Sequence, residues 1–207
     1  MSSLKLSRKP GRDWLTFDRS DRWGLLSLLA LVTLAAAWSG VIGPVIAWAR
    51  GEAIPVEVFS RVTVPELDAA GVSHGLAAYT VDLASPSAGQ RVLVLIPGVL
   101  NTVLVVGACW LVIRVMGTIA TGDPFDPVNI KRLRGLAALL LIGTPVVFFA
   151  HLSASGALLG SMDLGGLAPG FMFSIPWLPL VAGMVVALLA EAFRAGAALR
   201  EDVEGLV

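Results

Sequence analysis

The sequence predicts an all-α integral membrane protein with four transmembrane helices and a small β-rich extracytoplasmic loop between helices 1 and 2. Two observations carry this prediction: four long apolar stretches, and an unequal division of Lys and Arg among the segments that separate them. The composition agrees, because 56% of the residues are hydrophobic, only 14% are charged, and the mean hydropathy is +0.82. A soluble domain carries about 25% charged residues, so the soluble globular class is excluded.

The apolar stretches supply the four membrane crossings. They are Gly24 to Trp48, Val92 to Ile113, Gly135 to Leu159 and Ile175 to Phe193. Each contains about 20 residues or more, which at about 1.5 Å per residue crosses roughly 30 Å of hydrocarbon.

Prolines and small residues lie within these stretches. Each crossing holds a proline that favours a kink by freeing a backbone carbonyl: Pro44, Pro97, Pro145, and the pair Pro176 and Pro179. Small residues let membrane helices approach closely. They stand beside the prolines at Gly40, Gly43, Gly98 and Gly143, and Gly156 with Gly160 forms a GxxxG pair near the outer end of the third crossing.

The segments between the stretches predict the orientation. The leader, the middle loop and the tail (residues 1–23, 114–134 and 194–207) hold 12 of the 15 Lys and Arg. The two loops on the other side (residues 49–91 and 160–174) hold three, although each set contains 58 residues. Because basic residues near helix ends are retained in the cytoplasm, we expect both termini to be cytoplasmic. The leader mixes aromatic and basic residues and is expected to anchor the first helix at the lipid headgroups.

The first outside loop carries a β-strand signal. Alternation of apolar and polar residues is typical of half-buried strands. It is present in Val56, Val58, Val62 and Val64, which alternate with Glu57, Arg61 and Thr63 around Phe59, and the run Ala78 to Leu83 is similar. We expect two antiparallel strands. A lone hairpin is marginal in water, so the strands should pack on the helices or pair with another copy.

Three polar side chains inside the apolar stretches are candidates for function, because polarity in hydrocarbon is costly: Asn101, His151 and Glu191. For Asn101 an interhelical hydrogen bond is the first interpretation and an ion ligand the second, and His151 is interpreted as a packing residue. Glu191 has Arg194 three residues later on the same helix face, with Arg132 or Arg134 as the alternative partner. The lone cysteine, Cys109, is expected to be a small packing residue.

No catalytic constellation is present. The sequence contains no Gly-rich phosphate loop, HExxH, GxSxG or CxxC motif. We therefore expect no enzyme activity, no cofactor and no metal. Without a basic face on a soluble module, direct nucleic-acid binding is not expected either.

The best candidate constellation lies on the cytoplasmic side. Asp126 is placed to cap a helix with Pro127 at its first position, and the tail continues the fourth helix with an apolar face of Ala195, Leu199 and Val203. Two interpretations stay open for the acids of the tail: a contact with the basic loop, or a solvated helix end. The candidate partner-binding residues are Phe125, Asn129, Lys131, Arg132, Arg134, Arg194, Arg200 and Glu204.

Two segments resemble a known family. PFDPVNIKRLR before the third crossing and LAEAFRAGAALREDVEGLV at the end of the chain are similar to the bacterial membrane family called domain of unknown function 2975. The resemblance covers Phe125 to Val207, and the first two crossings match in layout only. It implies a bacterial inner-membrane location and an unassigned activity. It also implies a cytoplasmic partner, a small helix-turn-helix regulator encoded beside such proteins.

The leading hypothesis is a membrane sensing or regulatory subunit that acts through this cytoplasmic partner. The alternative is a small permease or efflux component lined by Asn101, Pro97 and Pro145, and a membrane enzyme is third. A homo-oligomer remains open.

Overall fold

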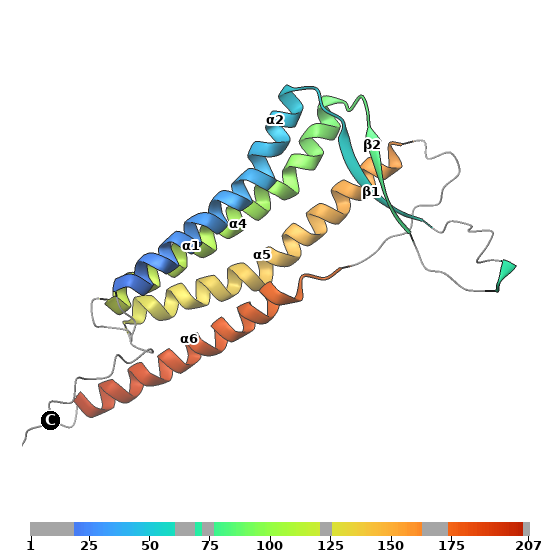
Figure 1. Ribbon diagram of the computed structural model, residues 1–207. Coiled ribbons are helices and arrows are strands. Elements are labelled where there is room, and N and C mark those ends of the chain that lie inside the picture. Colours follow the sequence, from blue (N-terminus) through green and yellow to red (C-terminus); the bar gives the residue numbers. More distant parts are fainter. Residues whose placement is uncertain (1–18, 61–68, 72–76, 121–125, 163–173, 205–207) are drawn as a thin grey trace, which may run out of the picture.

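The computed structural model describes residues 19–60, 69–71, 77–120, 126–162 and 174–204 (Figure 1). The helices are α1 (Arg19–Ala37), α2 (Gly43–Ala49), α4 (Ala88–Ala120), α5 (Pro127–Gly160) and α6 (Trp177–Glu204), with a π-helical turn η1 (Trp38–Ile42) between α1 and α2. The strands are β1 (Ile54–Ser60) and β2 (Ala77–Leu83).

Four helical runs are long and apolar enough to cross a membrane: Ser20–Ala49, Ala88–Ile119, Pro127–Gly160 and Trp177–Asp202. The chain is therefore a multi-pass membrane protein, as the apolar stretches predict. The helices are longer than those stretches. With 33 residues in α4 and 34 in α5, each reaches about 50 Å at about 1.5 Å per residue and extends beyond a hydrocarbon core.

The helices form an open layer. A chain of 207 residues also has room for a closed four-helix bundle, but the described helices do not form one. Figure 1 shows α1 beside α4, α4 beside α5, and α5 beside α6. Among the described residues, α1 and α6 make no extensive contact with each other. We call the end of the layer that carries β1 and β2 the sheet end, and the end where α4 stops and α5 begins the loop end.

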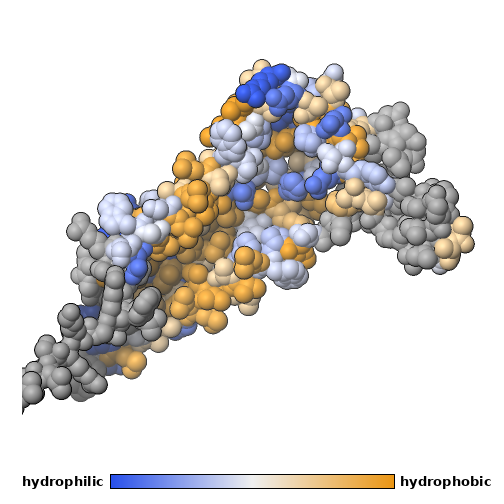
Figure 2. Space-filling model, in the orientation of Figure 1, coloured by the Kyte–Doolittle hydropathy of each residue, from blue (hydrophilic) through white to orange (hydrophobic). Residues whose placement is uncertain are grey.

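The surface of the layer agrees with a membrane location. Figure 2 shows hydrophobic residues over the middle of the helices, and the most hydrophilic residues toward the ends. Many large apolar side chains are exposed, such as Leu178 on α6 and Val103 on α4. A face of this kind is stable only against lipid or another protein.

The first crossing accommodates Pro44 by a π-helical turn. Proline lacks an N–H and collides with the carbonyl four residues back, which here is Gly40. The turn bypasses this problem, and the Gly43 N–H donates to the Trp38 carbonyl, five residues earlier. The first two crossings then touch backbone to backbone, since a Cβ atom at Gly98 would lie 2.1 Å from the Gly40 carbonyl oxygen.

The predicted GxxxG pair makes no such contact. A Cβ atom at Gly156 or Gly160 would meet nothing within 4 Å. The backbones of the first two crossings meet instead at Gly98 and at Gly40, which lies within the π-helical turn.

The predicted antiparallel strand pair is confirmed. Ile54 pairs with Leu83 and Ser60 with Ala77. Alternate β1 residues Ile54, Val56 and Val58 are buried against Leu158 and Leu159 near the end of α5. The sheet therefore packs on the helices, which relieves the marginal stability of an isolated hairpin. The remaining part of the predicted strand signal, residues 61–64, lies outside the described residues.

Candidate functional sites

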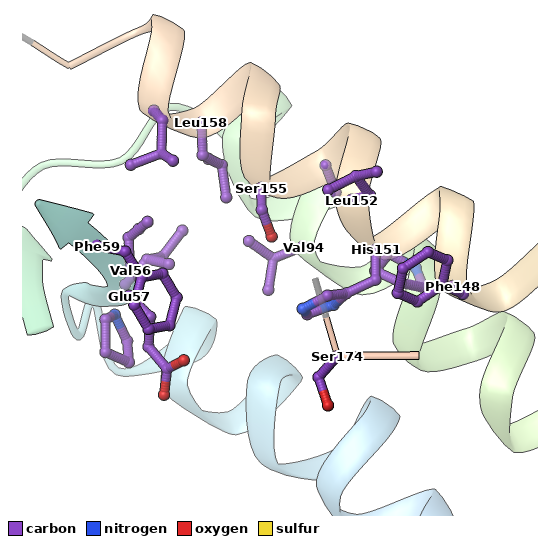
Figure 3. A pocket seen from close by; sticks show the side chains of 15 residues that line it. Val56, Glu57, Phe59, Val94, Phe148, His151, Leu152, Ser155, Leu158 and Ser174 are labelled. Atoms are coloured by element: carbon purple, nitrogen blue, oxygen red, sulfur yellow. The ribbon is translucent and has the colours of Figure 1, made fainter. Parts of the chain in front are cut away.

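A cavity of about 780 Å³ lies at the sheet end. Its wall comes from β1, from Val94 and Pro97 on α4, from the last turns of α5 beginning at Phe148, and from Ser174 before α6. Figure 3 shows Val56 and Phe59 of β1 on one side, with His151 and Phe148 on another. The volume and the mostly apolar lining are typical of a small-molecule site.

The cavity exists because α6 begins at a level of the layer where it cannot cover the last turns of α5. Pro176 precedes α6, and Pro179 lies in its first turn, where its missing N–H costs no helical hydrogen bond. Farther along α6, Gly183 lies against Leu140 and Leu141 of α5. Since the two helices run in opposite directions, α6 has no turn left to cover the part of α5 beyond about Phe148 (Figure 1). Strand β1 covers that part instead, and the cavity remains between them.

Few polar groups line this cavity. Among the described residues they are the side chains of Glu57, His151, Ser155 and Ser174. Glu57 alternates with the buried residues of β1 and is exposed, and the described part of the lining contains no Lys or Arg. The charge of the described wall is therefore a carboxylate, which favours an amine or hydroxyl head group over an anionic one.

The loop end carries a polar cluster, defined here as Thr118, Asn129, Arg132 and the Arg114 carbonyl. The Thr118 hydroxyl donates to the Asn129 side-chain oxygen. Arg132 Nη1 lies 3.3 Å from that same oxygen and 3.0 Å from the carbonyl oxygen of Arg114. The cluster thus ties the end of α4 to the first turn of α5.

The start of α5 follows the sequence prediction. Asp126 caps the helix by accepting a hydrogen bond of 2.7 Å from the Val128 N–H, and Pro127 follows at the first helical position. This cap fixes the first turn of α5, which places Asn129 and Arg132 against α4.

An ion-pair group joins α5 to α6 beside the cluster. Arg194 donates to Glu191 from Nε at 2.9 Å, and Arg134 Nη2 lies 3.5 Å from the other Glu191 oxygen. The expected Glu191–Arg194 pair is confirmed, and Arg134 is a second partner rather than an exclusive alternative. Beneath these charges, Val115, Leu133 and Ala190 form a buried apolar contact of α4, α5 and α6.

The candidate partner-binding residues are not equivalent. Asn129 has 0% exposure, so a partner on this face would not contact its side chain directly. Lys131, Arg134 and Arg194 are exposed, and Arg132 is half-buried in the polar cluster. Phe125 and the side chain of Glu204 lie outside the described residues.

The tail differs from one expectation. Helix α6 continues to Glu204 as predicted, and Leu199 and Arg200 are exposed. Within the described part of the tail, however, Glu201 and Asp202 form no ion pair with the basic loop. Arg134 pairs with Glu191 instead, which is nearer along α6 and on the side that faces α5.

The polar candidates inside the apolar stretches also lie in different surroundings. His151 lines the cavity, although the sequence favoured a packing role for it. Asn101 is exposed near the middle of α4, and no described residue supplies the interhelical hydrogen bond expected for it. Cys109 is buried as a packing residue, with its sulfur 3.9 Å from the Leu29 carbonyl.

Two groups were not recognised from the sequence. Glu57 was interpreted only as part of a strand pattern, although a carboxylate beside an apolar surface was a usable signal. Thr118 gave no signal, because its role depends on Asn129 arriving from the next helix. Across the described residues, no three His, Cys, Asp or Glu side chains gather as a metal site.

Comparison with known proteins gives one match. The family model described as "Protein of unknown function (DUF2975)" matches residues 75–207. No curated protein and no solved structure matches the chain. The match begins before β2 and takes in α4, α5, α6 and the loop-end cluster.

Proposed function

The chain belongs to the DUF2975 family of unknown function, and we propose that it is a membrane sensing or regulatory subunit acting through a soluble cytoplasmic partner. The observation that carries this proposal is the course of α4 and α5. Both helices line the sheet-end cavity, and both continue without interruption to the polar cluster at the loop end. A change in their packing at one end is therefore transmitted to the other.

The proposal places the loop end in the cytoplasm and the sheet end outside, in the inner membrane of a bacterial cell. The support is the distribution of Lys and Arg, since 12 of the 15 belong to the leader, the middle loop and the tail. In this orientation the cavity takes its ligand from outside or from the outer leaflet, and the exposed basic residues face the cytoplasm.

The ligand in this proposal is an amphiphile with an amine or hydroxyl head group. Apolar side chains such as Val94 and Leu158 would hold its hydrocarbon part, and Glu57 would hold the head group. Because Glu57 is exposed, this charge pair would form at the mouth of the cavity and would weaken as the salt concentration rises. A long-chain amine is the simplest probe of this chemistry.

Binding of dodecylamine tests the ligand side. The full chain in lipid nanodiscs should bind dodecylamine more tightly than dodecanol or dodecyl sulfate, as measured by calorimetric titration. Glu57→Gln should weaken the binding of dodecylamine several-fold and leave dodecanol unaffected. Asp82→Asn is the matched control, because it removes the same charge from the neighbouring strand outside the cavity lining. Equal binding of all three probes would contradict the ligand assignment.

The partner side of the proposal concerns the exposed loop-end surface, composed of Lys131, Arg134 and the tail. The family resemblance suggests a small helix-turn-helix regulator as the partner. The tail supports a docking role because Leu199 is 67% exposed beyond the apolar stretch of α6. In this proposal Leu199 is the apolar part of a contact whose rim is formed by the charged residues beside it.

Copurification in mild detergent tests the partner side. Cytosolic proteins recovered with the wild-type chain should be lost when residues 195–207 are deleted, and also in Lys131→Glu. The charge-changing variant Asp82→Lys at the sheet end is the control and should retain them. Recovery of the same proteins by all four chains would exclude this face as the docking site.

The permease alternative has less structural support. Below the cavity, Leu104 of α4 presses on Gly143 of α5, where an added Cβ atom would lie 2.7 Å from its Cδ1 atom. Leu139 similarly fills the space at Gly107. The α4–α5 contact is therefore closed at these levels, and no solute path runs between these two helices there. We propose no catalytic step for the protein.

A further inference from the structure

Asn101 is the most unusual polar residue in the membrane part of the chain. It lies near the middle of α4 and of the apolar stretch from Val92 to Ile113, and its side chain is exposed. No described residue hydrogen-bonds to its amide. A primary amide in water forms hydrogen bonds that lipid tails cannot form. Placing it in hydrocarbon without a partner therefore costs free energy.

Helix α4 has two faces that do not point toward α1 or α5, and these two faces differ in composition. One face carries Val99, Val103, Val106 and Trp110, which recur at three- and four-residue intervals and are all exposed. This face is uniformly apolar and suits lipid. Asn101 is two residues from Val99 and from Val103, about 200° around the helix, so it lies on the opposite face.

The face of Asn101 has the composition of a helix contact. Its neighbours at helical spacing toward the loop end are Val105 and Ala108, which are half-buried, and Pro97, toward the sheet end, belongs to the cavity wall. Ala108 is small, and small residues let another helix approach closely within a membrane. A single asparagine among such residues is a known device for fixing helix register and partner number.

We propose that α4 pairs with α4 of a second copy of this chain through reciprocal hydrogen bonds between the two Asn101 side chains. An amide carries a partly negative oxygen and a partly positive NH₂ group, so it is complementary in charge to its own copy. Both copies have the same orientation in the membrane, so a twofold axis along the membrane normal brings equivalent residues together at the same depth. At Asn101 this face of α4 is exposed, and within the described part of the chain α1 and α6 do not close over it.

This pairing rests on the geometry of α4 and not on the sensing function. It would hold if the cavity had no ligand, and the sensing function could fail without affecting it. The two ideas are tested by separate measurements.

Cysteine cross-linking in native membranes tests the contact directly. In a Cys109→Ala background, which removes the chain's single cysteine, Asn101→Cys should give a disulfide-linked dimer after oxidation with copper phenanthroline. Val103→Cys is the matched control, since it lies at nearly the same depth on the lipid face and should remain monomeric. Equal cross-linking at both positions, or none at Asn101→Cys, would overturn the proposed contact. A cross-link from Asn101→Cys to a different protein would also overturn it.

The chemistry of the contact is tested by the oligomeric state of the full chain in nanodiscs or mild detergent. Wild type and Asn101→Gln should be dimeric by native mass spectrometry, whereas Asn101→Leu should self-associate about tenfold more weakly. Thermal melting should show that Asn101→Leu remains folded, because no described residue of its own chain bonds to the side chain. A monomeric wild type, or an Asn101→Leu protein as dimeric as wild type, would refute the pairing. Loss of dodecylamine binding in Asn101→Leu with an unchanged oligomeric state would assign Asn101 to the ligand instead.

Discussion

At the scale of single residues, two glycines set the spacing of the first two crossings. The Gly40 and Gly98 backbones touch, and Thr102 reinforces the contact, because its hydroxyl lies 3.1 Å from the Ala36 carbonyl oxygen and 2.8 Å from that of Gly98. Close backbone contacts of this kind hold helices together in lipid, where burial of apolar surface gives no advantage. The contact therefore depends on the absence of a side chain at both positions.

The variant Gly98→Ala tests this dependence. Its Cβ atom would lie 2.1 Å from the backbone oxygen of Gly40, so η1 must move away, at a cost of about 1–3 kcal/mol. The melting temperature in detergent should fall by several degrees. Gly117→Ala on the same helix is the control, because nothing lies within 4 Å of its added atom and alanine favours a helix. A Gly98→Ala protein as stable as Gly117→Ala would contradict the close contact.

Contacts within one helix can be predicted from the sequence, whereas contacts between helices cannot. The Glu191–Arg194 pair and the Asp126 cap depend on residues a few positions apart, so helix geometry alone predicts them. The contact of Gly40 with Gly98 and the bond from Thr118 to Asn129 join different helices. They depend on how those helices rotate and on the π-helical turn at Pro44, and a single sequence contains no direct signal of either.

At the scale of elements, the strand pair acts as a lid over the end of α5. Val58 is 1% exposed, and it packs with Val56, Leu158 and Leu159. The alternation of apolar residues predicts these strands, because each strand has one buried and one exposed face. The alternation does not predict the cavity, which arises from the position where α6 begins relative to α5.

The variant Val58→Ala should loosen the sheet from α5. Loss of buried methyl groups leaves a small void, with an expected cost of about 1–3 kcal/mol. Hydrogen exchange of β1 and β2 amides should become faster, while exchange in α6 should not change. Glu57→Ala is the control, because the neighbouring side chain is exposed and points away from this apolar contact. Equal exchange rates in the two variants would show that the sheet does not depend on this packing.

At the scale of the whole molecule, sequence composition alone predicts the number of crossings, because apolar length is a local property. The open arrangement of the helices is not predicted, since apolar residues face lipid and neighbouring helices alike. The orientation is a separate prediction from charge, and it decides which end receives a ligand and which end meets a partner.

Cysteine labelling with a membrane-impermeant maleimide tests the orientation. In a Cys109→Ala background, Glu52→Cys at the sheet end should react in intact cells. Lys131→Cys at the loop end should react only after the membrane is permeabilised, and both positions are exposed in the structure. Reaction of Lys131→Cys in intact cells would reverse the proposed roles of the two ends.

The central claim is that α4 and α5 connect the cavity to the loop-end surface. The most direct test is a distance measurement by electron spin resonance in nanodiscs, with spin labels at Ile119→Cys and Lys131→Cys in a Cys109→Ala background. Both labelled side chains are exposed near the polar cluster. Saturating dodecylamine should shift the distance distribution between the labels, and Glu57→Gln should suppress the shift at the same concentration. An unchanged distribution while dodecylamine occupies the cavity would contradict the claim.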